Sequence, residues 1–80
     1  MDLQETVQGM LSTDYRERFK AEYQQLAIRC DRLKQFLLKI ESDETVKHDC
    51  PESLLQAQYY TMCEYLHILE QRSIIEHIKL

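Results

Sequence analysis

Apolar side chains at alternating steps of four and three residues are the feature that most constrains the fold of this chain. This first seam consists of Phe19, Tyr23, Leu26, Cys30, Leu33, Leu37 and Ile40. The spacing is the heptad pattern of a helix that packs lengthwise against another helix. At the usual helical rise, a helix over residues 13–41 is roughly 40 Å long. Because that exceeds the core of a compact 80-residue globule, the sequence predicts one arm of a hairpin.

A second long helix is predicted over residues 51–79. Pro51 favours a helix start, because the missing N–H of proline costs nothing in the first helical turn. The second seam again alternates steps of four and three and consists of Leu55, Tyr59, Met62, Leu66 and Leu69. The polar segment from Ser42 to Asp49 is the predicted loop. The two helices are therefore expected to pack antiparallel at a shallow crossing angle.

Residues 1–12 are predicted to form a short N-terminal helix. Asp2 is a candidate cap, Glu5 lies where a capping-box partner is expected, and Gly9 is a candidate stop. An apolar edge that could dock on the hairpin is formed by Leu3, Val7 and Met10. The alternative is a frayed terminus. The whole chain, residues 1–80, is expected to be a single all-α domain.

Several apolar residues fall outside the two seams. A second face of the helix over 51–79 carries Tyr65, Ile68, Ile75 and Ile78, while Ile28, Phe36 and Leu38 lie off the first seam. A two-helix hairpin has one internal interface and cannot cover two apolar faces on each arm. The chain is therefore predicted to form a homo-oligomer. In the alternative, the short first helix and the chain ends cover this surface.

Composition and charge exclude several classes of function. A net charge of −4 argues against a DNA-binding protein, because duplex binding is largely electrostatic. The short apolar runs predict no membrane span. An odd number of cysteines and the absence of a leading apolar segment indicate a reducing cytoplasm. No cofactor is expected.

The sequence offers weak metal and catalytic signals. Cys63 and His67 are four residues apart on one predicted helix, but structural zinc sites usually need four ligands. The favoured interpretation is a small buried Cys63 and a surface His67, with no metal site; a metal-binding bundle is the weakest alternative. No glycine-rich loop or nucleophile elbow occurs. The chain is not expected to be an enzyme.

A polar stripe beside the first seam is the best candidate for a binding site. It consists of Tyr15, Arg18, Glu22, Gln25, Arg29 and Arg32. An aromatic ring and guanidinium groups suit a phosphorylated purine, because the base stacks on the ring and the forked donors bind phosphate oxygens. The alternative is a solvated face with ion pairs such as Arg18–Glu22.

The length of the stripe constrains any such site. Tyr15 and Arg29 are separated by about 21 Å along one helix, which is too far for a dinucleotide to span within one subunit. If two copies paired these helices antiparallel across a two-fold axis, Tyr15 of one copy would approach Arg29 of the other. A pocket at a subunit boundary would follow, and symmetry would make two of them.

Arg72 is a fixed charge in the otherwise apolar stripe of Tyr65, Ile68 and Ile75. A charge in such a position needs a partner. Glu76, four residues further on, is the favoured one by spacing. The alternative places several copies of Arg72 around an oligomer axis, where they would form an anion site.

The sequence also resembles a known family along most of its length. In the first arm the resemblance rests on residues 15–26, from Tyr15 to Leu26, and on Arg29, Leu33 and Phe36. In the second arm it rests on residues 48–51, Leu54, Leu55, Gln58, Met62, Tyr65, Leu66, residues 68–70, Arg72, Ile75 and Glu76. The chain is similar to the small helical-hairpin anti-defence sponges of phages, the anti-CBASS and anti-Thoeris proteins.

The resemblance implies a phage protein that acts in the cytoplasm of the infected bacterial host. Such sponges hold cyclic di- or trinucleotides, or cyclic ADP-ribose isomers, without cleaving them, and they assemble as multimers, commonly hexamers. By resemblance, Tyr15 would stack on a base and Arg29 would occupy a phosphate-contact position, where lysine is frequent in relatives. Arg72 would match the arginine of a second, trinucleotide-type site. A protein–protein adaptor with no small-molecule ligand is the alternative function.

Overall fold

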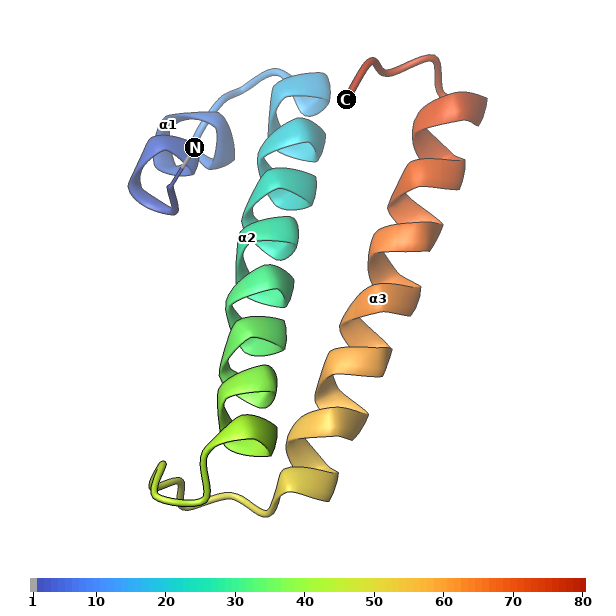
Figure 1. Cartoon of the computed structure of the whole chain (residues 1–80). Helices are drawn as coiled ribbons and strands as arrows, with labels where there is room; N and C mark the ends of the chain where they lie inside the picture. The colour runs from blue at the N-terminus through green and yellow to red at the C-terminus, as the bar shows by residue number, and fades with distance from the viewer. Residues whose placement is uncertain (1) are drawn as a thin grey trace.

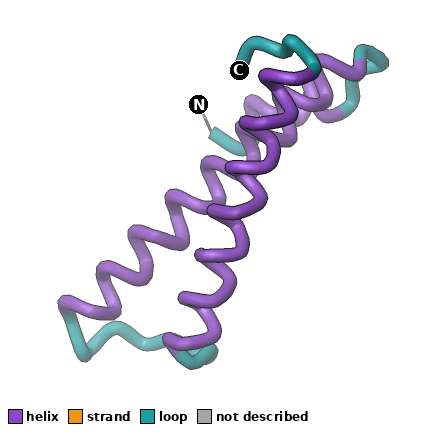
Figure 2. Tube along the Cα trace, turned by 90° about the vertical axis from the view of Figure 1, so that its right-hand side faces the viewer, coloured by secondary structure: helices purple, strands orange, loops and turns teal. Residues whose placement is uncertain are grey.

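A computed structural model describes residues 2–80 of the chain, and every regular element in that range is helical. A short 3-10 turn, η1 (Gln4–Thr6), leads into α1 (Val7–Met10), which is followed by the long helices α2 (Tyr15–Ser42) and α3 (Glu52–Ile75). α2 and α3 lie antiparallel, and α1 lies on the side of α2 that faces away from α3 (Figure 1). In Figure 1 the two arms lie further apart at the termini than at the loop, whereas in the view turned by 90° they lie further apart at the loop (Figure 2). The two arms therefore cross at an angle. The molecule measures 45 × 25 × 16 Å.

The starts of the long helices follow the capping signals closely. The Asp14 carboxylate accepts a hydrogen bond from the Arg16 backbone N–H and caps α2. The Glu17 carboxylate, in the first turn of α2, accepts a hydrogen bond from the Ser12 hydroxyl. Pro51 is the N-cap of α3. It was predicted to be the first helical residue, so the helix starts one residue later than predicted.

The short N-terminal helix docks on α2, but not through the predicted apolar edge. Thr6 is its buried side chain, whereas Val7 and Met10 remain largely exposed. Gly9 is not the helix stop, because it lies inside α1. Its role is steric: a Cβ at this position would lie 2.9 Å from the Cβ of Ala21. The predicted segment 1–12 begins with Met1, which lies outside the described residues.

The core lies between α2 and α3 along the two predicted seams. Every first-seam residue is buried or half-buried, and so is every residue of the second seam. The most enclosed part is near the chain termini, where Phe19 (2 % exposed), Leu69 (0 %) and Ile78 (5 %) pack together. The heptad prediction is confirmed, and the core is densest where Phe19 faces Leu69.

The predicted end of the second arm is wrong. α3 ends at Ile75, and His77 adopts a left-handed backbone conformation with φ of 58°. The Ile78 N–H then bonds to the Ser73 carbonyl at 2.8 Å, and the His77 N–H bonds to the Ile74 carbonyl. This pair of bonds is a Schellman motif, which reverses the chain after a helix. Ile78, predicted on the outer face, is thereby turned into the core.

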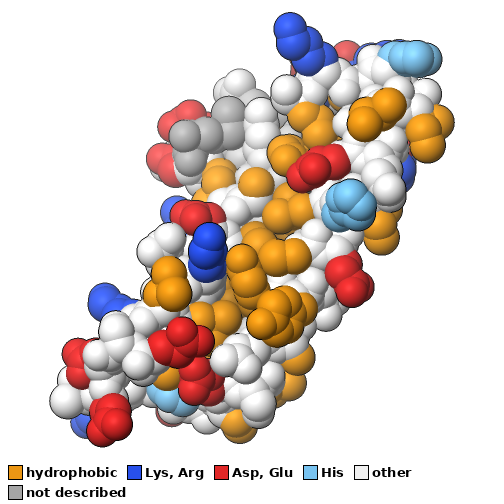
Figure 3. All heavy atoms as spheres, turned by 45° about the vertical axis from the view of Figure 1, so that its right-hand side comes forward, with side chains coloured by type: hydrophobic (Ala, Val, Ile, Leu, Met, Phe, Trp, Pro, Cys, Tyr) orange, Lys and Arg blue, Asp and Glu red, His pale blue; other side chains and the backbone are white. Residues whose placement is uncertain are grey.

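One lateral face of the hairpin still exposes apolar side chains. Tyr65, Ile68 and Ile75 of the predicted second face lie there, and Ile75 is 76 % exposed. The space-filling view shows hydrophobic side chains along the length of the molecule, flanked by acidic groups (Figure 3). The chain ends therefore cover Phe19 and Ala21 but leave much of α3 uncovered.

Candidate functional site

Tyr15, Arg72 and Glu76 form a polar cluster that joins the start of α2 to the end of α3. The Tyr15 hydroxyl donates to the Glu76 carboxylate at 2.6 Å and accepts from the Arg72 guanidinium at 2.7 Å. Arg72 also forms an ion pair with Glu76 at 3.0 Å. The guanidinium carbon lies 5.0 Å from the centre of the Phe19 ring, within cation–π range. We call these three polar residues the terminal clasp.

The protonation of the clasp follows from its contacts. The hydrogen bond from Tyr15, followed by the one from Arg72, lowers the pKa of the Glu76 carboxyl. The same bond to Glu76 raises the pKa of the Tyr15 phenol, and the bond to Glu76 raises the pKa of Arg72. At neutral pH the clasp therefore holds a neutral phenol between a guanidinium and a carboxylate.

The predicted partner of Arg72 is confirmed, whereas its contact with Tyr15 was not predicted. The two residues are 57 positions apart, so no local spacing rule joins them. The signal was present in the seams: antiparallel pairing that sets Phe19 against Leu69 also brings the next turns, with Tyr15 and Arg72, together. The contact between Tyr15 and Arg72 therefore depends on the register of the two arms and not on the periodicity within either arm.

Other residues of the polar stripe make contacts outside the terminal clasp. Arg18 donates to the Ser12 carbonyl at 2.9 Å instead of forming the suggested ion pair with Glu22. The Glu22 carboxylate accepts a hydrogen bond from the Tyr65 hydroxyl of α3. Glu22 is thus a second polar link between the arms, beside the exposed apolar face.

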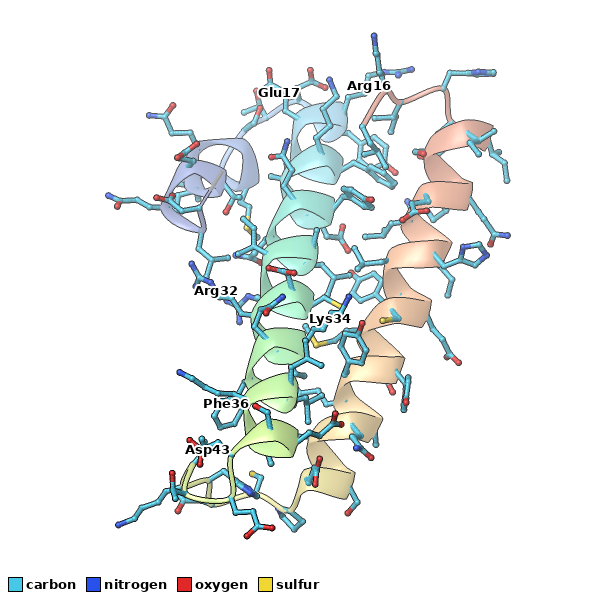
Figure 4. The ribbon with its side chains drawn as sticks, viewed as in Figure 1. Arg16, Glu17, Arg32, Lys34, Phe36 and Asp43 are labelled. Carbon is cyan, nitrogen blue, oxygen red and sulfur yellow. The ribbon has the colours of Figure 1, made fainter. Side chains whose placement is uncertain are left out.

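Arg29 and Arg32 are exposed, and within residues 2–80 no salt bridge or side-chain hydrogen bond involves either of them. Arg32 extends away from α3, on the side of α2 that carries α1, whereas Lys34 points towards α3 (Figure 4). Arg32 lines an open groove of about 520 Å³ together with Ile28 and Asp31. The structure therefore brings Tyr15 together with Arg72 and leaves Arg29 and Arg32 apart from both.

Cys63 and His67, four residues apart on α3, differ in exposure and in contacts. The Cys63 sulfur lies 3.7 Å from the sulfur of Cys30 on α2, and His67 is exposed. Among residues 2–80 there is no group of three or more His, Cys, Asp or Glu side chains placed to hold a metal ion. In the same range, none of the helices is long and apolar enough to cross a membrane.

Comparison with known proteins gives one result for this chain. A family model described as Sequestin matches residues 13–75. No curated protein and no solved structure matches. The matched range contains both long helices and the clasp residues Tyr15 and Arg72, and it excludes α1 and the buried Ile78. Sequestins are phage anti-defence proteins that act as sponges, and this chain belongs to the Sequestin family.

Proposed function

We propose that this protein sequesters cyclic oligonucleotides or cyclic ADP-ribose isomers without cleaving them, and so blocks CBASS- or Thoeris-type immunity in the cytoplasm of an infected bacterium. The observation that carries the proposal is the family match over residues 13–75. A sponge needs tight binding but no reaction. That demand suits a hairpin whose exposed cations can contact phosphates.

The proposed binding unit is a homo-oligomer. The supporting observation is the exposed apolar face, on which Tyr65, Ile68 and Ile75 are 42 %, 52 % and 76 % exposed. Burying such side chains against a second copy would stabilise the assembly by about 25 cal/mol per Å² of apolar area. A hexamer is the proposed assembly by family resemblance.

Two arginines are proposed as phosphate contacts at the boundary between copies. Arg29 and Arg32 are exposed on α2, so binding a phosphate would not require either to break a salt bridge found within residues 2–80. Tyr15, which is 44 % exposed, would offer one ring face to a base while its hydroxyl remains in the clasp. Arg18 is the proposed minor contact, because it is already bound to the Ser12 carbonyl.

Arg72 differs from those arginines because its guanidinium already forms an ion pair with a carboxylate. The Glu76 carboxylate lies 3.0 Å from the Arg72 Nε, so a phosphate at this second proposed site must displace it. Glu76→Gln removes the competing charge and retains the side-chain size. The variant is expected to bind a trinucleotide more tightly than the wild type, by calorimetry.

The central test is a thermal-shift screen against cyclic di- and trinucleotides and cyclic ADP-ribose isomers, followed by calorimetry. A ligand at 100 times its Kd raises the free energy of unfolding by about 2.7 kcal/mol, which a melting curve detects. Arg29→Ala and Tyr15→Ala should abolish binding to the preferred ligand while the oligomer persists in sedimentation. Lys39→Ala, at another exposed basic residue of α2, is the matched control. A chain that binds none of these signals is not a sponge for them.

A protein–protein adaptor is the second candidate, and the same exposed isoleucines favour it. In that function the face of α3 would dock on a partner helix. Sedimentation distinguishes the two: an adaptor is a monomer or dimer with no response to cyclic nucleotides, whereas the sponge is a larger oligomer that responds to one of them.

A further inference from the structure

Two thiols face each other across the interior of the hairpin. The sulfur atoms of Cys30 on α2 and Cys63 on α3 are 3.7 Å apart, and both cysteines are free. Cys30 is buried, Cys63 is half-buried, and the third cysteine, Cys50, is exposed in the segment before α3. A disulfide requires a sulfur separation of about 2.05 Å. Small side-chain movements would therefore bring the pair to bonding distance.

We propose that Cys30 and Cys63 form an oxidation site, at which a two-electron oxidant such as hydrogen peroxide creates a disulfide between the two arms. Cys30 belongs to the first seam and Cys63 follows Met62 of the second. Neither cysteine is a proposed ligand contact, so this inference is independent of the proposed function. Its chemistry depends on the difference in exposure between the two sulfurs.

Cys63 reacts first because it is the accessible member of the pair. It lines an open groove of about 450 Å³ together with Glu64, His67 and Ile68. The thiolate is the reacting form of a cysteine, and burial raises the pKa of the Cys30 thiol to about 11. Cys30 therefore stays protonated and shielded while peroxide reaches Cys63.

The two steps conserve atoms and electrons. The Cys63 thiolate attacks one peroxide oxygen, the O–O bond breaks, and hydroxide leaves and takes a proton to become water, which gives Cys63 sulfenic acid. The Cys30 sulfur then attacks the Cys63 sulfur, the S–O bond breaks, and the departing hydroxide takes the Cys30 proton as a second water. The thiols lose two electrons together, and the peroxide gains them.

The disulfide would join the arms near the middle of both long helices. It closes a loop over residues 30–63, which contains the whole connection between α2 and α3. Closing a loop restricts the unfolded chain more than the folded one. The oxidised protein is expected to melt on the order of 10 °C higher than the reduced protein, and a thiol reductant should reverse the shift.

The experiment treats the reduced full-length protein with hydrogen peroxide and then counts thiols. The count should fall from three free cysteines to one, with an intact mass lower by about 2 Da and a linked peptide that contains Cys30 and Cys63. Cys50→Ser should form the same bond and lose its remaining thiols. Cys63→Ser should leave Cys30 reduced.

Three reaction products would overturn the inference. They are a link that involves Cys50, a dimer joined between chains in place of the internal bond, or oxidation of Cys63 to the sulfinic acid with Cys30 still reduced. A thiol count that stays at three would also do so, provided that the same treatment lowers the thiol count of the unfolded chain. The melting temperature gives an independent readout, since a bond that strains the hairpin would lower it.

Discussion

The two halves of the hairpin differ in how completely they bury the seam. Near the termini, Leu69 of α3 is fully enclosed by Phe19 and Ile78. Towards the loop, the α3 seam residues Leu55 and Tyr59 are only half-buried, and the neighbouring Tyr60 is 64 % exposed. In the loop half, Leu37 of α2 is buried, but the facing α3 seam residues stay half-buried. The same heptad pattern therefore produces a more open core in this half than near the termini.

The difference comes from the segments that flank the long helices. At the terminal half, α1 covers Ala21 from outside and the chain after α3 returns Ile78 to Phe19. At the loop half, the flanking segment contributes an edge contact of His48 with Phe36, whose ring centres lie 6.5 Å apart. Two helices alone cannot enclose a seam. A third element is needed, and a second copy could supply it in the loop half.

The largest effect is expected from Leu69→Ala. Truncation of a fully buried leucine leaves a cavity and typically costs about 2–5 kcal/mol. Leu55→Ala, at the half-buried position of the same helix, should cost roughly half as much in the isolated chain. Urea unfolding measures both values. Equal losses at micromolar and lower concentrations would show that the two halves are equally packed.

Gly9→Ala tests whether α1 closes the terminal half. The added methyl would lie 2.9 Å from the Ala21 Cβ, and overpacking of this kind costs about 1–3 kcal/mol. The free energy of unfolding should fall, and α1 should lose protection in hydrogen exchange. The compensating double variant with Ala21→Gly restores the space, and Ala21→Gly alone gives the cost of about 1 kcal/mol that glycine brings to a helix interior. Recovery is judged against that single variant. If the double variant shows no recovery, the close approach is not the cause.

His77→Gly should strengthen the turn that returns Ile78 to the core. His77 has φ of 58°, a conformation that costs a residue with a Cβ roughly 1–2 kcal/mol and glycine very little. Glycine also loses more conformational entropy on folding, which offsets part of this difference. The free energy of unfolding of His77→Gly is therefore expected to rise by about 0.5–1 kcal/mol. Gln71→Gly, within α3, should be destabilising by about 1 kcal/mol. A loss of stability in His77→Gly would contradict the left-handed turn.

The smallest effect concerns the pH dependence of the terminal clasp. The folded-state pKa of Glu76 is lower than its ordinary value of 4.5, so the unfolded chain binds the proton first as the pH falls. The contribution of the clasp is therefore present above that value and is lost as the pH falls through the folded pKa. Melting temperatures between about pH 3 and 6 should fall less steeply in Glu76→Gln than in the wild type. Glu64→Gln, at an exposed site, should keep the wild-type slope.

Much of the fold could be predicted from periodicity and capping signals. Alternating steps of four and three residues predicted which faces of α2 and α3 meet, and Pro51 located the start of α3 within one residue. The end of α3 was missed because His77 replaces the glycine that usually marks a left-handed turn. The role of Gly9 was missed for a different reason, since a close approach between helices leaves no mark in a local pattern.

The candidate site could be predicted less completely. Local spacing identified Glu76 as the partner of Arg72, and that contact is present. It also suggested an Arg18–Glu22 pair, yet both side chains find other partners, in Ser12 and Tyr65. Contacts between the arms depend on the register and crossing angle of the two helices. The spacing of residues within a single helix predicts neither. Whether Tyr15 of one copy meets Arg29 of another depends on an interface beyond the single chain, and it stays a prediction.

The position of Ile78 has a consequence for how family resemblance relates to foldability. The matched segment, residues 13–75, stops three residues before this core side chain and begins after Thr6 and Gly9, which pack on α2. A fragment trimmed to those limits would expose Phe19 on one flank and Ala21 on the other. Both long helices lie within the family match, but the side chains that pack against their first turns belong to the flanking segments, before residue 13 and after residue 75.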